Sequence, residues 1–253
     1  MAEKTFTSEA GHWYKPDGTP AYTYINKKGE EKKTTLREAR KEGLFPSVTG
    51  IIDCQMKWRL VNWKIDQNIM SALTITRKDG EAEADFVARI KEDAQAQAEK
   101  AAERGKYVHA VIQQGFEGGA TQLGADDHKY YASAFNTLAK ECDEVLQLWE
   151  CEKPFASPLG FGGKVDLQNS QFIIDIKTTD KDIMDPKFQT RPDHAQQLAA
   201  YRGETKRKCG ILFINVNTAE SRLIWITEEG LVQGWECFFH LLQYWKAKNK
   251  YGR

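Results

Sequence analysis

A short polar turn between two apolar runs constrains this chain more than any other feature. Residues 164–168 and 171–176 are rich in apolar side chains, and they flank Asn169 and Ser170. A polar pair of this kind closes a tight hairpin between antiparallel strands. The sequence therefore predicts two antiparallel strands joined by a two-residue loop.

The predicted register brings two acidic side chains together. With the polar pair as the loop, Asp166 faces Ile173 and Lys164 faces Asp175. Side chains alternate between the two faces of a strand, so these four residues and Lys177 project to the same side. The Cβ atoms of Asp166 and Asp175 are then diagonal neighbours roughly 7 Å apart, close enough for both carboxylates to reach one cation.

Two interpretations of this face stay open from the residues alone. In one, magnesium or manganese binds between the acids, because oxygen ligands suit these ions. Lys177 would then hold the attacking water or offset negative charge in the transition state. In the other, the stretch is a surface hairpin with an ordinary salt bridge, since an Asp-x-Lys tripeptide is too short to be specific.

A long helix is predicted upstream of the hairpin, over residues 81–116. Apolar side chains recur along it in steps of three and four, from Phe86 to Ile112. His109 lies on the same inward face, beside Gly105 and Val108. A single histidine in such a place is usually a hydrogen-bonded core residue, so the helix pattern alone assigns it no role.

Four ordered motifs together resemble the PD-(D/E)xK nuclease superfamily. They are His109, then Gly163-x-x-Asp166, then Asp175-Ile176-Lys177, then Gln197-x-x-x-Tyr201. The closest likeness is to the RecB-type branch, which includes viral recombination exonucleases and the mitochondrial genome maintenance exonuclease. The resemblance covers residues 45–216. It implies an α/β fold with a restriction-endonuclease-like core, in which helices flank a central mixed β-sheet, and an N-terminal helical elaboration.

The resemblance also implies roles for these residues. Asp166, Asp175 and Lys177 would be catalytic, and Mg²⁺ or Mn²⁺ would be bound by His109, Asp166, Asp175 and the backbone carbonyl of Ile176. Gln197 and Tyr201, four residues apart and so on one helix face, would position the substrate.

The implied activity is that of a metal-dependent DNA exonuclease in viral recombination, repair or genome processing. A structure-specific endonuclease of the same fold and an inactive nucleic-acid-binding module are the alternatives. DNA is the expected partner. The resemblance also allows a homo-oligomer, since some relatives form rings, and a single-strand annealing or binding protein as partner.

Composition limits the class of protein. The 253 residues carry 36 basic and 36 acidic side chains, which argues mildly against a broad basic surface. We expect no membrane contact and a cytoplasmic location, in the host cytoplasm if the protein is viral, because the N-terminus lacks the apolar core of a secretory signal. Some RecB-type nucleases hold an iron–sulfur cluster with three clustered C-terminal cysteines. The five cysteines here are scattered, so no iron–sulfur cluster is expected.

The remaining pattern predicts one nuclease domain over residues 1–253. Residues 1–80 would be the N-terminal elaboration, 81–226 the core and 227–253 a C-terminal helix. Within these parts the sequence indicates a helix after Thr35, a helix-like run over 52–65, a helix over 126–142, a strand over 145–151, a helix over 195–206 capped by Asp193, and strands over 210–217 and 222–226.

Basic and aromatic side chains alternate over residues 57–64 of the N-terminal elaboration. Lys57, Trp58, Arg59, Trp63 and Lys64 could grip a single strand of nucleic acid. The two tryptophans do not share a face at helical spacing, so burial of at least one of them in a core is the alternative.

Overall fold

The computed structural model describes residues 11–142 and 148–252. These residues form two compact units, one made of the described residues within 11–55 and 108–252 and the other of Met56–Tyr107. No helix in the described part of the protein is long and apolar enough to cross a membrane.

A five-stranded mixed sheet forms the centre of the first unit. The strand order is β5-β6-β7-β8-β9, in which β7 and β8 are parallel and the other neighbours are antiparallel. The predicted mixed α/β architecture is therefore confirmed. The strands are β5 (Glu150–Ser157), β6 (Phe161–Gln168), β7 (Phe172–Thr179), β8 (Lys208–Asn215) and β9 (Ser221–Trp225).

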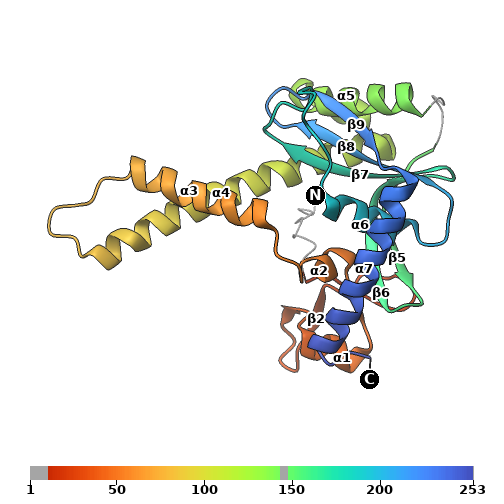
Figure 1. Ribbon diagram of the computed structural model, residues 1–253, viewed down its shortest axis with the longest axis horizontal. Helices are drawn as coiled ribbons and strands as arrows, with labels where there is room; N and C mark the ends of the chain where they lie inside the picture. Colours follow the sequence, from red (N-terminus) through yellow and green to blue (C-terminus); the bar gives the residue numbers. More distant parts are fainter. Residues whose placement is uncertain (1–10, 143–147, 253) are drawn as a thin grey trace. The chain divides into compact units, whose positions relative to one another are not determined.

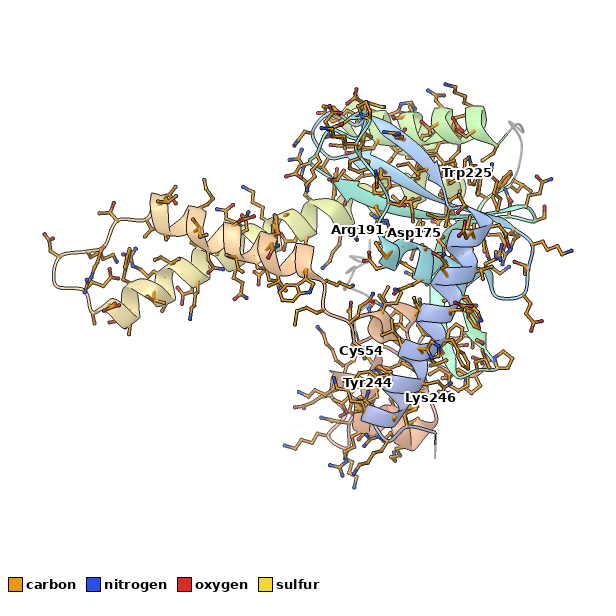
Figure 2. All side chains as sticks on the ribbon, viewed as in Figure 1. Cys54, Asp175, Arg191, Trp225, Tyr244 and Lys246 are labelled. Atoms are coloured by element: carbon orange, nitrogen blue, oxygen red, sulfur yellow. The ribbon has the colours of Figure 1, made fainter. Side chains whose placement is uncertain are left out.

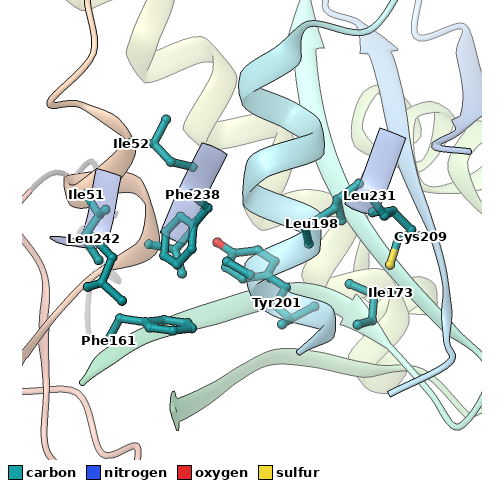
Figure 3. Close-up of a cluster of buried hydrophobic side chains, with 14 of the residues drawn as sticks. Ile51, Ile52, Phe161, Ile173, Leu198, Tyr201, Cys209, Leu231, Phe238 and Leu242 are labelled. Atoms are coloured by element: carbon teal, nitrogen blue, oxygen red, sulfur yellow. The ribbon is translucent and has the colours of Figure 1, made fainter. Parts of the chain in front are cut away.

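Helices cover both faces of this sheet (Figure 1). On one face, α2 (Val48–Ile52), α6 (Pro192–Arg202) and α7 (Glu228–Lys248) bury a cluster that includes Ile173 and Ile211 (Figure 3). On the other face, the end of α4 and α5 (Ala125–Glu141) bury a second cluster that includes Ile174 and Leu212. Neighbouring strand residues alternate between these clusters, as expected for a strand buried on both faces.

The predicted two-residue loop of the central hairpin is wrong. Leu167 pairs with Ile174 and Gln168 with Ile173, so the turn is longer than Asn169 and Ser170. The Oδ1 atom of Asn169 accepts hydrogen bonds from the backbone N–H groups of residues 171 and 172, at 2.9 and 2.8 Å, and this fixes the wider turn. The register is displaced by two residues from the predicted one. An even displacement of the register does not by itself move a side chain to the other face.

The N-terminal residues of the first unit build two small sheets and two short helices. Strand β1 (Trp13–Tyr14) pairs with β4 (Phe45–Pro46), and β2 (Thr23–Ile25) pairs with β3 (Glu31–Lys33). Helix α1 (Leu36–Glu42) is capped by Thr35, as predicted. The predicted helical run over 52–65 is interrupted, because α2 ends at Ile52 and the next helix begins at Trp58.

Further boundaries differ from the prediction. Helix α6 begins at Pro192 and not at Ala195, because Arg191 is its N-cap and a proline is favoured in the first turn. Asp193 therefore lies inside the first turn. The helix ends at Arg202 and not at residue 206. The predicted strand over 145–151 instead begins at Glu150 as β5, and residues 143–147 lie outside the described part of the protein.

The second unit consists of two helices and their connection. Helix α3 spans Trp58–Thr74, and helix α4 spans Glu83–Gln114, so that α4 continues from Val108 into the first unit. The π-helical segment η1 (Gly115–Gly119) and the 3₁₀ turn η2 (Ala120–Gln122) follow α4. Gly118, inside η1, adopts a φ of 91°, a left-handed conformation that interrupts the helical geometry there.

Candidate active site

Asp166 lies where two strands of the sheet separate. The β6–β7 ladder contains only the two residue pairs nearest the turn, whereas β7 and β8 are paired along their whole length. On the side of Leu167 away from the turn, the two strands are not paired, and the carboxylate of Asp166 in β6 accepts a hydrogen bond of 2.7 Å from the backbone N–H of Ile176 in β7. Val165 and Leu167 belong to different core clusters, although residues two apart normally share a face. Strand β6 therefore twists at Asp166, and the twist carries this carboxylate toward β7.

Asp175, which is labelled in Figure 2, forms the centre of a hydrogen-bonded network with Lys177 and with Gln197 of helix α6. Its side chain is 2% exposed, and its Oδ2 lies 2.7 Å from the Nζ of Lys177. The amide of Gln197 donates to Asp175 Oδ1 at 2.7 Å and to the Tyr201 hydroxyl at 2.9 Å. Lys177 Nζ in turn donates to Gln197 Oε1 at 3.2 Å. These four predicted site residues therefore contact one another directly.

Helix α6 positions Gln197 and Tyr201, which are one turn apart on its buried face. The ring of Tyr201 packs so closely on β6 that a Cβ at Gly163 would lie 2.8 Å from its Cε1 atom. Close packing therefore explains why the first position of the Gly163-x-x-Asp166 motif is a glycine, because any larger side chain would displace Tyr201 from the strand.

His109 approaches the same place from helix α4, within the first unit. Its Nδ1 lies 3.9 Å from Asp166 Oδ2, and its side chain is 26% exposed. Burial, and after it the positive charge of Lys177, lowers the pKa of His109 to about 4. The imidazole is therefore neutral at pH 7 and retains a lone pair that a metal ion could bind.

The two carboxylates are poorly solvated. Burial raises the pKa of Asp175 to about 6, and the neighbouring charge of Asp166 adds to this effect, while Lys177 opposes it. Burial likewise raises the pKa of Asp166. Two acids whose charged forms are disfavoured side by side are a common feature of sites that bind a cation or transfer a proton.

The donor set has the chemistry of a site for a hard divalent cation, but it is not arranged as a closed metal centre. Among the described residues, no three His, Cys, Asp or Glu side chains are grouped so that they could hold an ion as they stand. His109 and Asp166 are close enough to share an ion, whereas Asp175 is bound by Lys177 and Gln197. Ile176 contributes its N–H to Asp166, and the role of its carbonyl as a ligand stays a prediction.

Lys164 is a further charged residue at this site. Its ammonium forms an ion pair with Glu152, and both side chains are largely buried. Lys164 also acts electrostatically on Asp166 and His109, whose pKa values it lowers. Strand alternation placed Lys164 on the acidic face, although no role followed from that. Glu152 has a φ of 53°, a conformation unusual for a non-glycine residue that sequence patterns do not reveal.

Comparisons with known proteins give distant structural similarities. No protein-family model matches the sequence, and no curated protein matches it. A solved structure from Eubacterium rectale, described as a "Putative exonuclease", has 16% sequence identity and a TM-score of 0.41, and the match covers 59% of this protein and 69% of that one. The structure of SSO0001 has 16% identity and a TM-score of 0.30, with coverage of 72% and 86%. Both TM-scores lie below 0.5, so the inferences below depend on the geometry of the site.

Proposed function

We propose that this protein is a metal-dependent DNA nuclease of the PD-(D/E)xK type, with a RecB-like restriction-endonuclease core, and that it acts as an exonuclease. The observation that carries the proposal is the direct contact of Lys177, Asp175 and Gln197 beside the Asp166–His109 pair. Five polar side chains from two strands and two helices converge there. A surface hairpin with an ordinary salt bridge would not bury its acids in this way.

Each of these residues would have a separate role in cleavage. Asp166, Asp175 and His109 would hold Mg²⁺ or Mn²⁺, with the Ile176 carbonyl as a further ligand. When bound, the cation would supply Lewis-acid polarisation of the phosphate and lower the pKa of a water. Lys177, held by the carboxylate of Asp175 and the amide oxygen of Gln197, would orient the nucleophile and balance negative charge that develops on the phosphate. Gln197 and Tyr201 would keep this lysine and the substrate in place.

One observation favours a second candidate, a nucleic-acid-binding module without cleavage. Lys177 lies against the Asp175 oxygen that a metal would need, and the described residues contain no ready-made group of three ligands. If this ion pair persists when the protein is mixed with metal, the site is structural. Metal binding and cleavage must therefore be measured separately.

The cleavage experiment uses labelled linear duplex, single-stranded and circular DNA with Mg²⁺, Mn²⁺ or EDTA. An exonuclease degrades the linear substrates only when metal is present and leaves the circles intact, whereas cleavage of circles indicates an endonuclease. Asp175→Asn should remove activity, and Lys140→Ala, which alters an exposed lysine at the end of α5, should not.

Metal binding has its own measurement. Calorimetric titration or electron paramagnetic resonance of Mn²⁺ should show a site that Asp166→Ala and His109→Ala weaken. Metal binding without cleavage of any DNA would support the inactive module, and the absence of both would reject the proposed site altogether.

A further inference from the structure

Lys164 projects from strand β6 to the face of the sheet that carries His109. Its neighbours in the strand face helix α6, because a Cβ at Gly163 would lie 2.8 Å from the ring of Tyr201 and Val165 belongs to the cluster that α6 covers. Side chains alternate between the two faces of a strand, so Lys164 points to the opposite face, which the end of α4 covers. The lysine therefore lies on the side of the sheet from which His109 approaches the site.

Glu152 of strand β5 has an unusual backbone conformation opposite Asp166. The β5–β6 ladder pairs the residues on both sides of Glu152 with those on both sides of Asp166, which places these two residues opposite each other. The described ladder omits the pair itself. The carboxylate of Asp166 accepts a hydrogen bond from β7 instead, and Glu152 adopts a φ of 53°. Residues other than glycine are rare in this left-handed region, and such strain gathers at functional sites.

The carboxylate of Glu152 holds the ammonium group of Lys164. The buried Oε2 atom of Glu152 forms an ion pair with the Nζ atom of Lys164. The two side chains are 17% and 24% exposed, so both charges are partly removed from water. Charges that lose water need a close partner, and this pairing fixes the position of the ammonium group. The Lys164 side chain is still in part open to solvent, so a ligand can reach it.

Lys164 decides whether the site is positively charged when a cation is bound. The charged side chains there are three carboxylates and two ammonium groups, namely Glu152, Asp166, Asp175, Lys164 and Lys177. When the carboxylates are ionised, these groups leave one net negative charge, which a divalent cation turns into one net positive charge. A positive site attracts a phosphate. Without the ammonium group of Lys164, the same site would be neutral with its cation bound.

We propose that Lys164 binds a phosphate of the DNA backbone beside the one that is cleaved, and that Glu152 is the positioning residue that holds the lysine for this contact. The inference rests on the proposed nuclease function. Two residues along a strand span roughly 7 Å, so the flexible stem of Lys164 reaches a phosphate next to the one at Asp166. Contacts with backbone phosphates fix the register of a nucleic-acid strand, and register places one bond at the cation.

Binding of a labelled oligonucleotide tests the role of Lys164. Ca²⁺ replaces Mg²⁺ in this measurement, and a gel confirms that the DNA stays intact. Lys164→Met keeps the length of the side chain and removes its charge. It should raise the Kd about tenfold and lower the slope of log Kd against log salt concentration by about 0.9 for duplex DNA, or about 0.7 for a single strand. Lys164→Arg keeps the charge and should bind like the native protein.

Lys153→Met is the matched control. Lys153 also forms an ion pair on β5, with Glu150, but its side chain is 50% exposed and it pairs with Val165, on the other face of the sheet. Its Kd and salt slope should equal those of the native protein. A native Kd and slope in Lys164→Met, or an equal loss in Lys153→Met, overturns the proposal. Circular dichroism checks that each variant is folded, and Lys164→Arg supplies the folded comparison if Lys164→Met is less stable.

Glu152→Gln separates positioning from a structural role. Removing a negative charge cannot weaken the attraction for phosphate, so the Kd should stay the same or fall. The kcat with Mg²⁺ should fall about tenfold, because the ammonium group of Lys164 is no longer held in place. A Kd that rises in Glu152→Gln as it does in Lys164→Met would show that the ion pair serves the fold, and it would overturn the proposal.

This inference and the proposed function fail in different ways. DNA binding that depends on Lys164, in a protein that cleaves no DNA with any metal, would reject the nuclease function and support the phosphate contact. Cleavage by the native protein, with a Kd that does not depend on Lys164, would reject the phosphate contact alone. A native protein that binds no DNA overturns both.

Discussion

At the scale of single residues, Lys177 is the side chain on which the proposed chemistry depends most. It is 28% exposed, and it is held between Asp175 and Gln197 at 2.7 and 3.2 Å. Lys177→Ala should lower the rate of DNA cleavage at least about a hundredfold, because a positioned charge that acts in the transition state is removed. The Kd for DNA should change by less than about threefold. Turnover near the native rate in Lys177→Ala would contradict the assigned role.

His12 gives a prediction about pH that does not involve the site. Its ring stacks on Tyr22 at 3.9 Å, and burial, followed by the charges of Lys164 and Lys33, lowers the pKa of His12 to about 4. The unfolded protein takes up this proton near pH 6.5, and the folded protein does so only near pH 4. The free energy of unfolding should therefore fall as the pH falls from 6.5 to 4, by about 3 kcal/mol for this group.

The measurement is urea unfolding at a series of pH values, for the native protein and for His12→Asn. The pKa of His109 is lowered in the same direction, so the native curve contains both contributions, and the difference between the two proteins isolates His12. If the free energy of unfolding falls with pH by the same amount in both proteins, His12 is not the source of the loss of stability.

Which residues of β7 share a face was predictable from the sequence, and which atoms touch was not. Strand alternation placed Asp175 and Lys177 together, and the error of two residues in the register does not change this. Asp166 reaches the same place through the twist of β6, which breaks the alternation between Val165 and Leu167. The separation of β6 from β7 at Asp166 was not predictable, because it depends on the hydrogen bond to Ile176 across the gap. The pattern of α4 gave His109 an inward position, but it gave no indication of the distance to Asp166.

At the scale of secondary-structure elements, helix α6 depends on close packing against helix α7. A Cβ at Gly234 of α7 would lie 2.6 Å from both atoms of the backbone carbonyl of Ala195 in α6. Gly234→Ala should therefore force the two backbones apart and lower the free energy of unfolding by about 1–3 kcal/mol. Because α6 carries Gln197 and Tyr201, cleavage should fall as well.

Gly124→Ala is the matched control for this substitution. Gly124 precedes helix α5 at a φ of −64°, and a Cβ there would meet no atom within 4 Å. Chemical unfolding of both variants gives the comparison. A Gly234→Ala protein as stable as the Gly124→Ala protein would show that the α6–α7 interface has room for a methyl group.

The sequence predicts the start of a helix correctly where a common N-cap residue precedes it, and incorrectly where the N-cap residue is an unusual one. Thr35 and Thr227 cap α1 and α7 through hydrogen bonds to the third residue beyond, as their sequences predict. The start of α6 was placed too late, because Arg191 is not a common cap and its partner is the side chain of His194. The strand that became β5 was predicted to end at residue 151 and not at Ser157, because the polar residues that follow Cys151 resemble those of a loop.

At the scale of the whole molecule, the division into two units leaves no mark in the composition. The sequence pattern predicts one domain, and helix α4 runs through the boundary at Val108 without a proline, while Gly105 just before the boundary does not interrupt the helix. The burial pattern is more informative. The described side chains of the second unit bury only Ser71 and Ala94, whereas Ile173, Ile174 and Ile211 of the sheet are fully buried.

This contrast predicts that the two units open with different free energies. Amides of α3 should exchange hydrogen at least about a hundredfold faster than those of β7 and β8, because few apolar contacts are lost when α3 opens. The measurement is native-state hydrogen exchange of the protein followed by mass spectrometry. Equal protection of α3 and β7 would contradict the prediction and would mean that the protein opens as one cooperative body.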